Sequence, residues 1–240
     1  MKSRKQNRNI GLIKGKKIIE MQNRIKLIII VLVFLTTGKI KAQNDTTQTR
    51  CVQSSVPVEV MIGNDYSSYQ VVVNKQIGNA DSRFSFYSMI NYDMYYDSSV
   101  PDNYFIQSIF FYSLTERIGV GIGANSKPFE GTKPLIALSY SIYTENIGLY
   151  IQPSYETYKD GLFELYTLFS WTKNNDKMFQ PYFKLEAYTS WGTEHSYTYH
   201  NWRLGLQYKR FRLGPALNVG YFGKDFDSMT NWGGFINIII

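Results

Sequence analysis

The feature that most constrains the fold is a series of short segments in which polar and apolar residues alternate over most of the chain. Alternation with a period of two places successive side chains on opposite faces of a β-sheet. In the run that begins at Arg83, Phe84 and Phe86 fall on one face, and Tyr87 and Asp93 fall on the other. The sequence therefore predicts an all-β protein.

Twelve such segments can be counted, and most have the 8 to 14 residues that suit a strand. A tilted strand that crosses a membrane needs about 9–11 residues. The first two segments could also form one strand with a bend at Gly63-Asn64, so ten strands and twelve strands both stay open. The expected segments are 57–64, 67–77, 82–97, 103–114, 117–126, 134–144, 146–158, 161–172, 178–191, 197–209, 210–222 and 230–240.

The breaks between the segments alternate in length. Those near residues 79–81, 115–117, 144–146 and 209–211 are tight, whereas those at 97–102, 126–133, 192–197 and 223–229 are longer and more polar. Short turns at one end and longer loops at the other are typical of bacterial outer-membrane barrels. We therefore expect a transmembrane antiparallel β-barrel over residues 57–240, with both ends of the chain on the periplasmic side.

The competing architecture is a soluble β-sandwich, which also has short alternating strands. Two features favour the barrel. From residue 43 on, 38 of 198 residues are aromatic, and many fall on the apolar faces; rings are enriched where a barrel meets lipid headgroups. The opposite faces carry charges in the middle of strands, which a water-filled lumen tolerates. A sheet that crosses a membrane must also have no open edge, and a closed barrel meets this condition.

The N-terminal region has the pattern of an export signal that begins at Met21. Arg24 and Lys26 precede an apolar run from Leu27 to Leu35, and Ala42 ends an acceptable cleavage site. A membrane anchor is the alternative, but it needs about 20 apolar residues. We expect a signal peptide over residues 21–42, a non-native extension over 1–20 and a flexible periplasmic segment over 43–56.

The formal net charge of +7 belongs mostly to this N-terminal region. Residues 1–42 hold 11 of the 26 lysines and arginines and one acid, so residues 43–240 carry 15 bases against 18 acids, a net charge of −3. This balance argues against a nucleic-acid partner. The single cysteine, Cys51, excludes a disulfide within the chain, and Gln48-Thr49-Arg50 before it does not match a lipidation signal.

Enzyme signatures are absent from the sequence. It contains no phosphate-binding glycine loop, no HExxH motif and no cysteine-based metal site, so we expect no catalytic residue, no metal and no cofactor. The glycines at 119, 121 and 123 alternate within a strand, where they admit a bulky neighbour. A barrel hydrolase acting on lipid or peptide would have only His195 and His200 as bases, and we expect His195 in a solvated external loop.

The inward-facing set by parity is rich in tyrosine, amide and charged side chains. Tyrosine rings stack on planar rings, and amides and charges hydrogen-bond polar edges, so this lining suits a small polar solute with an aromatic ring. The simpler alternative is that any small barrel fills its interior in this way without selecting a solute. The candidate lumen residues are Arg83, Tyr87, Asp93, Tyr150, Gln152, Glu164, Tyr166, Lys184, Glu186, Arg203 and Arg212.

One stretch near the C-terminus resembles the nucleoside-specific channel-forming (Tsx-like) family. Ser228-Met229-Thr230-Asn231-Trp232-Gly233-Gly234-Phe235 precedes an apolar strand and is similar to the turn that opens the last strand of that family's twelve-stranded barrel. Arg83-Phe84-Ser85-Phe86-Tyr87 looks like its early aromatic strand. The resemblance implies passive uptake of nucleosides. The sequence around Ala42 and the Asn-, Tyr-, Lys- and Ile-rich composition look like a Bacteroidota protein.

Together these patterns predict a monomeric outer-membrane channel for passive diffusion of small polar solutes, with nucleosides as the leading candidate. Its partners would be outer-membrane lipid and the solute. Two alternatives stay open: a barrel hydrolase, and a structural or adhesion barrel whose interior is sealed.

Overall fold

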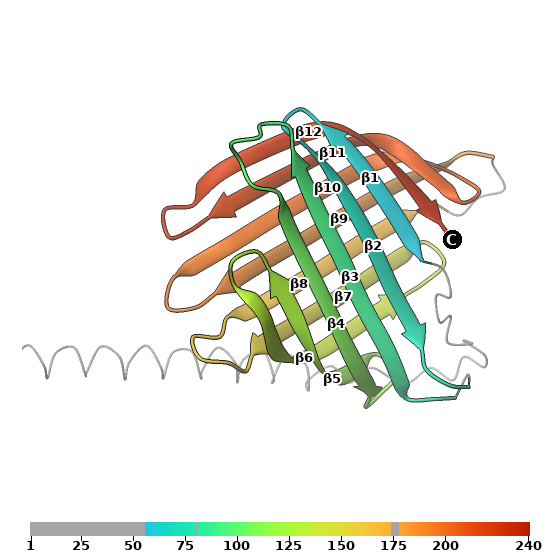
Figure 1. Ribbon diagram of the computed structural model, residues 1–240. Helices are drawn as coiled ribbons and strands as arrows, with labels where there is room; N and C mark the ends of the chain where they lie inside the picture. The colour runs from blue at the N-terminus through green and yellow to red at the C-terminus, as the bar shows by residue number, and fades with distance from the viewer. Residues whose placement is uncertain (1–55, 80, 174–177) are drawn as a thin grey trace, which may run out of the picture. The chain divides into compact units, whose positions relative to one another are not determined.

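The computed structural model describes residues 56–79, 81–173 and 178–240, and these form one closed antiparallel β-barrel (Figure 1). The expectation of an all-β barrel is confirmed, and the described residues make twelve strands rather than ten. The strands are β1 (Pro57–Gly63), β2 (Tyr66–Gln76), β3 (Phe84–Tyr95), β4 (Asn103–Ser113), β5 (Ile118–Lys127), β6 (Gly131–Tyr143), β7 (Ile147–Glu156), β8 (Phe163–Thr172), β9 (Gln180–Trp191), β10 (His195–Tyr208), β11 (Phe211–Phe222) and β12 (Asp227–Ile239).

Each strand pairs with its neighbours in sequence, and β1 pairs with β12 to close the sheet. The closing register runs from Pro57 opposite Ile239 to Gly63 opposite Gly233. Val56 and Ile240 extend it, because each backbone N–H donates to the other residue's carbonyl, at 2.9 and 3.0 Å. Closure leaves no sheet edge unpaired, which rules out the sandwich.

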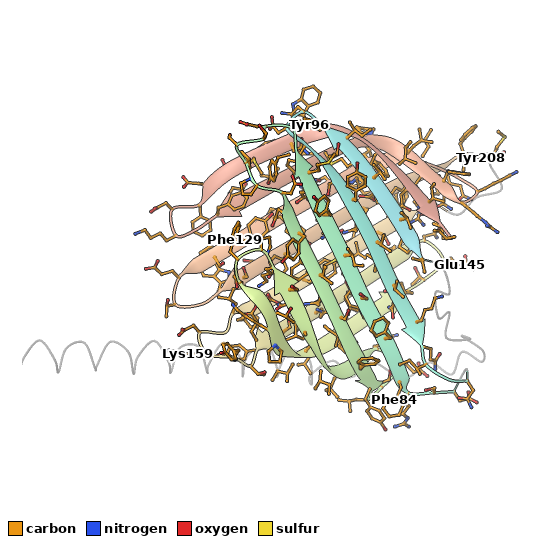
Figure 2. All side chains as sticks on the ribbon, viewed as in Figure 1. Phe84, Tyr96, Phe129, Glu145, Lys159 and Tyr208 are labelled. Carbon is orange, nitrogen blue, oxygen red and sulfur yellow. The ribbon has the colours of Figure 1, made fainter. Side chains whose placement is uncertain are left out.

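The barrel has two ends, which we call the terminal end and the loop end. The terminal end holds Val56, Ile240 and the connections that follow the even-numbered strands; the loop end holds those that follow the odd-numbered strands. Figure 2 shows Tyr96, Phe129 and Lys159 at the loop end, and Phe84, Glu145 and Tyr208 at the terminal end. The even strand count places both ends of the barrel sequence together, as expected.

Side chains alternate between the interior and the exterior of the barrel, as the period of two predicts. On the exterior of β5 and β6, Ile122, Ile136 and Leu138 are 69%, 53% and 51% exposed. Inward neighbours such as Asn125 and Leu135 are 1% and 2% exposed. The barrel is thus apolar outside and largely polar inside. No helix among the described residues is long and apolar enough to cross a membrane.

The loop end differs from expectation, because three of the four breaks expected to be long are short. The ladder continues through Ser126 opposite Thr132 and Lys127 opposite Gly131, leaving residues 128–130 as the turn. The breaks after β9 and β11 shrink to residues 192–194 and 223–226 in the same way. The polar residues here predicted loops, but they continue the strands beyond the apolar part of the exterior. Pairing with the neighbouring strand satisfies their backbone N–H and C=O groups.

The longer connections at the loop end are residues 96–102 and 157–162. Within the first, Asp97 accepts a hydrogen bond from the backbone N–H of Ser99 at 2.9 Å, and this bond lowers the pKa of the Asp97 carboxyl. Asp102 accepts from the backbone N–H of Tyr95 at 3.1 Å. These bonds tie the connection to the end of β3.

The seam between β1 and β12 has two facing glycines at the loop end of β1. Gly63 lies opposite Gly233, and a Cβ atom on Gly233 would overlap the carbonyl oxygen of Ile62. Asn231, which is fully buried, locks the β1–β2 turn to β12: its Oδ1 accepts from the backbone N–H of Asp65 at 3.0 Å, and its Nδ2 donates to the carbonyl of Tyr66 at 3.0 Å. The Trp-Gly-Gly-Phe stretch singled out in the sequence therefore lies at the closure of the barrel.

The expectations for the signal peptide at 21–42, the extension at 1–20, Cys51 and the flexible segment at 43–56, except for its last residue Val56, fall outside the described residues.

Candidate functional site: the barrel interior

The interior holds five acidic and five basic side chains on inward-facing strand positions, so its formal charge is balanced. Most of them are deeply buried: Glu59, Glu156, Glu164, Glu186 and Arg203 are each 3% exposed or less. Burying an ion is unfavourable unless a partner of opposite charge and further hydrogen bonds compensate it. The acids are Glu59, Asp93, Glu156, Glu164 and Glu186, and the bases are Lys127, Lys133, Lys184, Arg203 and Arg212.

One set of contacts, the central network, joins β1, β2, β9 and β10. Glu59 accepts from Lys184 Nζ and from Arg203 Nε, both at 2.8 Å. Glu186 lies 3.7 Å from Lys184 Nζ and accepts from the amide of Gln70 at 2.8 Å. The network therefore connects strands that are not neighbours in the sheet, across the interior of the barrel.

Further bonds extend the central network toward the loop end. Arg203 Nη1 donates to Asn218 Oδ1 at 2.7 Å, and Asn218 Nδ2 donates to the hydroxyl of Tyr66 at 3.3 Å. Tyr199 donates its hydroxyl to Glu186 at 3.0 Å. Each carboxylate here thus has several donors, which is what a buried charge requires.

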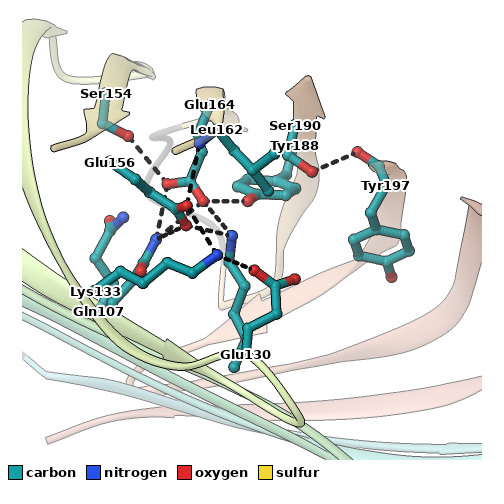
Figure 3. Close-up of polar contacts among 12 residues, drawn as sticks. Gln107, Glu130, Lys133, Ser154, Glu156, Leu162, Glu164, Tyr188, Ser190 and Tyr197 are labelled. Atoms are coloured by element: carbon teal, nitrogen blue, oxygen red, sulfur yellow. Dashed lines mark hydrogen bonds and ion pairs between the residues drawn. The ribbon is translucent and has the colours of Figure 1, made fainter. Parts of the chain in front are cut away.

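A second set, the loop-end network, joins β5 to β9 (Figure 3). Lys127 Nζ lies 2.9 Å from Glu156 and 2.5 Å from Glu164, and Asn125 donates to both carboxylates. Lys133 reaches Glu156 at 3.2 Å, and Tyr188 donates to Glu164 at 2.7 Å. Because Glu156 also accepts from the backbone N–H of Leu162 at 3.1 Å, the network holds the 157–162 connection against the barrel.

The interior tyrosines pack against one another. Tyr87 and Tyr150 are stacked with ring centroids 5.5 Å apart, and Tyr150 meets Tyr166 edge-on at 6.2 Å. Tyr188 and Tyr199 are stacked at 5.4 Å. Together with Met89, Ile109 and Leu135 they form a buried cluster. Their faces are therefore occupied by neighbouring rings, and a solute reaches them only if these side chains move.

A polar recess of about 40 Å³ lies in the loop-end half of the interior. Asp93, Asn91 and Tyr95 of β3 line it together with Tyr66 and Arg203. A volume of this size holds a few water molecules or one small ion, and is far smaller than a nucleoside. The recess has polar groups on aromatic walls, which is the combination expected of a site for a small polar group.

The structure brings ten of the eleven candidate lumen residues to the interior. Tyr87, Asp93, Tyr150, Gln152, Glu164, Tyr166, Lys184, Glu186 and Arg203 occupy inward positions of the strands, and Arg212 lies near the terminal end. Gln152 accepts from Tyr150 at 2.7 Å and donates to Gln107 at 2.7 Å. The guanidinium of Arg212 lies 4.5 Å from the ring centroid of Tyr182.

Arg83 is the exception, and its expected lumen position is wrong. It precedes β3 at the terminal end, is exposed, and contacts the hydroxyl of Tyr112 at 3.5 Å. Its carbonyl still accepts the backbone N–H of Ser113 at 2.8 Å, but Arg83 lies at the rim of the barrel, where a long cationic side chain can turn to solvent.

Sequence reasoning missed several residues that the networks need, among them Glu59, Asn125 and Lys127. Glu59 alternates with Val58 and Val60 in the first strand, so its parity predicted an inward carboxylate. Asn125 lies within the expected segment 117–126 and has the parity of the glycines at 119, 121 and 123, whereas Lys127 was harder to find because that segment ends before it. Among the described residues, no group of three or more His, Cys, Asp and Glu side chains could hold a metal ion.

The expectation that His195 lies in a solvated loop is wrong. His195 begins β10, is 5% exposed, and stacks on Phe226 with ring centroids 4.1 Å apart. Its Nδ1 lies 2.6 Å from the carbonyl oxygen of Gly223, and its Nε2 lies 2.9 Å from the hydroxyl of Thr198. A register shift between His195 and Tyr197 moves the ring out of simple alternation. His200 takes no part in these bonds and lies 6.2 Å from the ring of Tyr221.

No protein family model matches the chain, and no curated protein matches it. Solved structures similar to it include a KdgM porin, with 12% identity, a TM-score of 0.43 and coverage of 77% of this chain and 98% of that chain. A NanC porin has 13% identity, a TM-score of 0.45 and coverage of 78% and 98%. LpxR from Salmonella typhimurium has 9% identity, a TM-score of 0.41 and coverage of 77% and 99%. At these values the likeness does not extend to function.

Proposed function

We propose that the protein is an outer-membrane channel that lets small polar solutes diffuse through its interior. The observation that carries this proposal is the pair of buried ionic networks inside a closed, externally apolar barrel. Apolar residues of similar volume would fill a purely structural interior at equal or lower free energy, because buried ion pairs seldom repay their desolvation. Charged and amide side chains instead offer replacement contacts for the hydration shell of a passing solute.

The apolar exterior supports the membrane location. Large exposed apolar side chains occur all around the barrel, on strands from β1 to β12, as with Ile62, Leu204 and Trp232 at 66%, 62% and 65%. An exterior of this kind is unfavourable in water and suits a lipid bilayer.

The test of conduction is a planar-bilayer recording on the purified, refolded full barrel. We expect discrete current steps in potassium chloride. Nucleosides are the first solutes to add, because of the resemblance described above and the interior tyrosines. We expect adenosine or uridine to reduce the current and ribose, which lacks a base, to reduce it less. A current that nucleosides do not reduce would exclude nucleosides as the solute but keep the channel proposal. Absence of current would contradict the channel and favour a barrel with a sealed interior.

A matched pair of variants sharpens the test. Tyr199 lines the recess and stacks on Tyr188, so Tyr199→Ala removes one of the side chains that narrow the interior. Tyr155 faces outward and is 49% exposed. We expect Tyr199→Ala to raise the single-channel conductance severalfold and Tyr155→Ala to leave it unchanged. Equal conductance in both variants would contradict a passage beside Tyr199.

A second candidate function, hydrolysis of lipid, has one observation in its favour. A hydroxyl becomes an activated nucleophile when one ring nitrogen of a histidine contacts it and the other ring nitrogen is held by a hydrogen-bond acceptor. His195 has this arrangement, with Nε2 at the hydroxyl of Thr198 and Nδ1 at the carbonyl oxygen of Gly223. Thr198 shares the outward face of β10 with Trp202, which is 41% exposed. Release of fatty acid from phospholipid vesicles, lost in Thr198→Val and in His195→Ala but retained in His200→Ala, would establish it. A parent protein that releases none excludes it.

A further inference from the structure

Among the five acidic side chains of the interior, all but one are paired with a base. Glu59, Glu156, Glu164 and Glu186 each lie within 4.0 Å of a lysine or arginine nitrogen. Asp93 has no such ion pair among the described residues; Ser68 and Asn103, across the two neighbouring strands, are its hydrogen-bonding neighbours. Its negative charge is therefore not balanced by a direct partner.

The carboxylate of Asp93 lines the recess together with an acceptor that has no partner. Asn91, two residues earlier on the same inward face of β3, has a buried Oδ1 atom without a hydrogen bond in the described part of the chain. A buried carbonyl oxygen left unpaired is unfavourable by about 1–3 kcal/mol. The recess is thus lined by one negative charge and by a residue with one unused acceptor, which reaches a bound group once the Asn91 amide turns toward the recess. A donor that carries positive charge would satisfy both.

The base that lines the recess is already hydrogen-bonded to other groups. Arg203 also lines the recess, but its Nε is bound to Glu59 and its Nη1 to Asn218 Oδ1 and to the carbonyl oxygen of Trp202. The walls are aromatic: Tyr66 and Tyr95 have ring centroids 5.1 Å apart. Ring faces attract cations, most strongly where water is excluded.

We propose that the recess binds one small monovalent cation of the ammonium type, with Asp93 as its counter-charge and Asn91 Oδ1 as an acceptor. An ammonium group carries three or four N–H donors and a single charge, which match one carboxylate, one amide oxygen and the tyrosine rings. Its size fits the volume of about 40 Å³. A divalent metal ion fits less well, because its hard oxygen shell ordinarily includes more than one carboxylate.

The biological role of this site rests on the proposed channel. In that channel the site would lie in the loop-end half of the passage and would favour the passage of cations over anions. Its binding, however, is measurable without conduction. The two properties are therefore tested by separate experiments.

The binding experiment is saturation-transfer NMR on the refolded barrel in detergent micelles, with methylammonium chloride as the probe. We expect transfer to the methyl protons of methylammonium and at least fivefold less to those of tetramethylammonium, which has no N–H donor. Asp93→Asn and Asn91→Leu should each reduce the methylammonium signal severalfold. Asp225→Asn is the matched control, because Asp225 is an exposed carboxylate in the 223–226 turn at the same end of the barrel.

Heat-dependent mobility on a gel shows whether each variant is folded. If Asp93→Asn does not fold, Asn91→Leu and the comparison of the two probes still decide the matter. Equal transfer to both probes, or a signal that survives in a folded Asp93→Asn variant, overturns the site.

The conduction experiment is the zero-current potential across a potassium chloride gradient. We expect Asp93→Asn to lower the cation-to-anion permeability ratio severalfold and Asp225→Asn to change it much less. A protein that binds methylammonium without conducting refutes the channel and keeps the site. A protein that conducts, with binding unaffected by Asp93→Asn, refutes the site and keeps the channel.

Discussion

At the scale of the single residue, the interior is governed by how each buried charge is neutralised. Glu59 is the clearest case, because it is 3% exposed and accepts from two cations that are themselves buried. Removing its charge leaves Lys184 and Arg203 with Glu186 as the remaining acid nearby, at 3.7 Å from Lys184. An uncompensated buried cation is far less favourable than the lost bond alone.

We therefore expect Glu59→Gln to lower the free energy of unfolding by about 3 kcal/mol. The measurement is urea unfolding of the barrel in lipid vesicles, followed by tryptophan fluorescence. Glu116→Gln, in the exposed turn that precedes β5, is the control and should change stability by less than about 0.5 kcal/mol. Similar unfolding curves for the two variants would contradict the role given to Glu59.

Residue-level prediction from sequence worked wherever a side chain sits inside a regular ladder. Tyr87, Lys184 and Arg203 are inward because each strand keeps a strict alternation. The same rule failed for Arg83, which lies at the rim of the barrel just before β3, and for His195, where a register shift breaks the alternation. The partners within the networks could not be predicted, since they depend on which strands face each other across the barrel.

At the scale of the element, the seam between β1 and β12 depends on one glycine more than on its neighbour. A Cβ at Gly233 would overlap Ile62 O and lie 2.7 Å from Gly63 Cα, both backbone atoms that move only with the strand. A Cβ at Gly234 would have no heavy atom nearer than Gly214 O at 3.8 Å. The two adjacent positions therefore form a natural test of closure.

We expect Gly233→Ala to impair closure of the barrel and Gly234→Ala to be tolerated. The measurement is the fraction of refolded protein that keeps the faster mobility of a folded barrel on an unheated gel. The yield should fall severalfold for Gly233→Ala and stay near that of the parent for Gly234→Ala. Equal yields would show that β1 can move away from β12 without loss of the fold.

Element boundaries were predicted well where apolar alternation stops and poorly where polar residues continue a strand. The turns 144–146 and 209–210 match their sequence signals closely, whereas β12 begins at Asp227 and β10 at His195, within stretches expected to be loops. Polarity at the loop end therefore marks where the apolar exterior stops rather than where the strands end.

At the scale of the whole molecule, the exterior and the interior have opposite chemistry. Ile122 lies in the middle of β5 and is 69% exposed, so in the proposed outer-membrane location a charge placed there would face lipid hydrocarbon. A lysine near the bilayer midplane is unfavourable by about 2–4 kcal/mol in such barrels.

We expect Ile122→Lys to lower the free energy of unfolding in vesicles by about 2–4 kcal/mol. Glu116→Lys, in the exposed turn between β4 and β5, is the matched control and should have almost no effect. The same pair compared in detergent, where the charge can reach water, should differ less. An equal effect of both substitutions in vesicles would argue against a membrane-spanning belt at Ile122.

The order of the strands also dictates how the barrel must assemble. Eleven of the twelve pairings join strands adjacent in sequence, and only the pairing of β1 with β12 spans the whole barrel sequence. Hairpins can form early because their loops are short, whereas the β1–β12 contact carries the largest loss of chain entropy. Until it forms, the N–H and C=O groups on the facing edges of β1 and β12 have no partner. The closing step is therefore also the step at which two incompletely folded molecules could pair edge to edge.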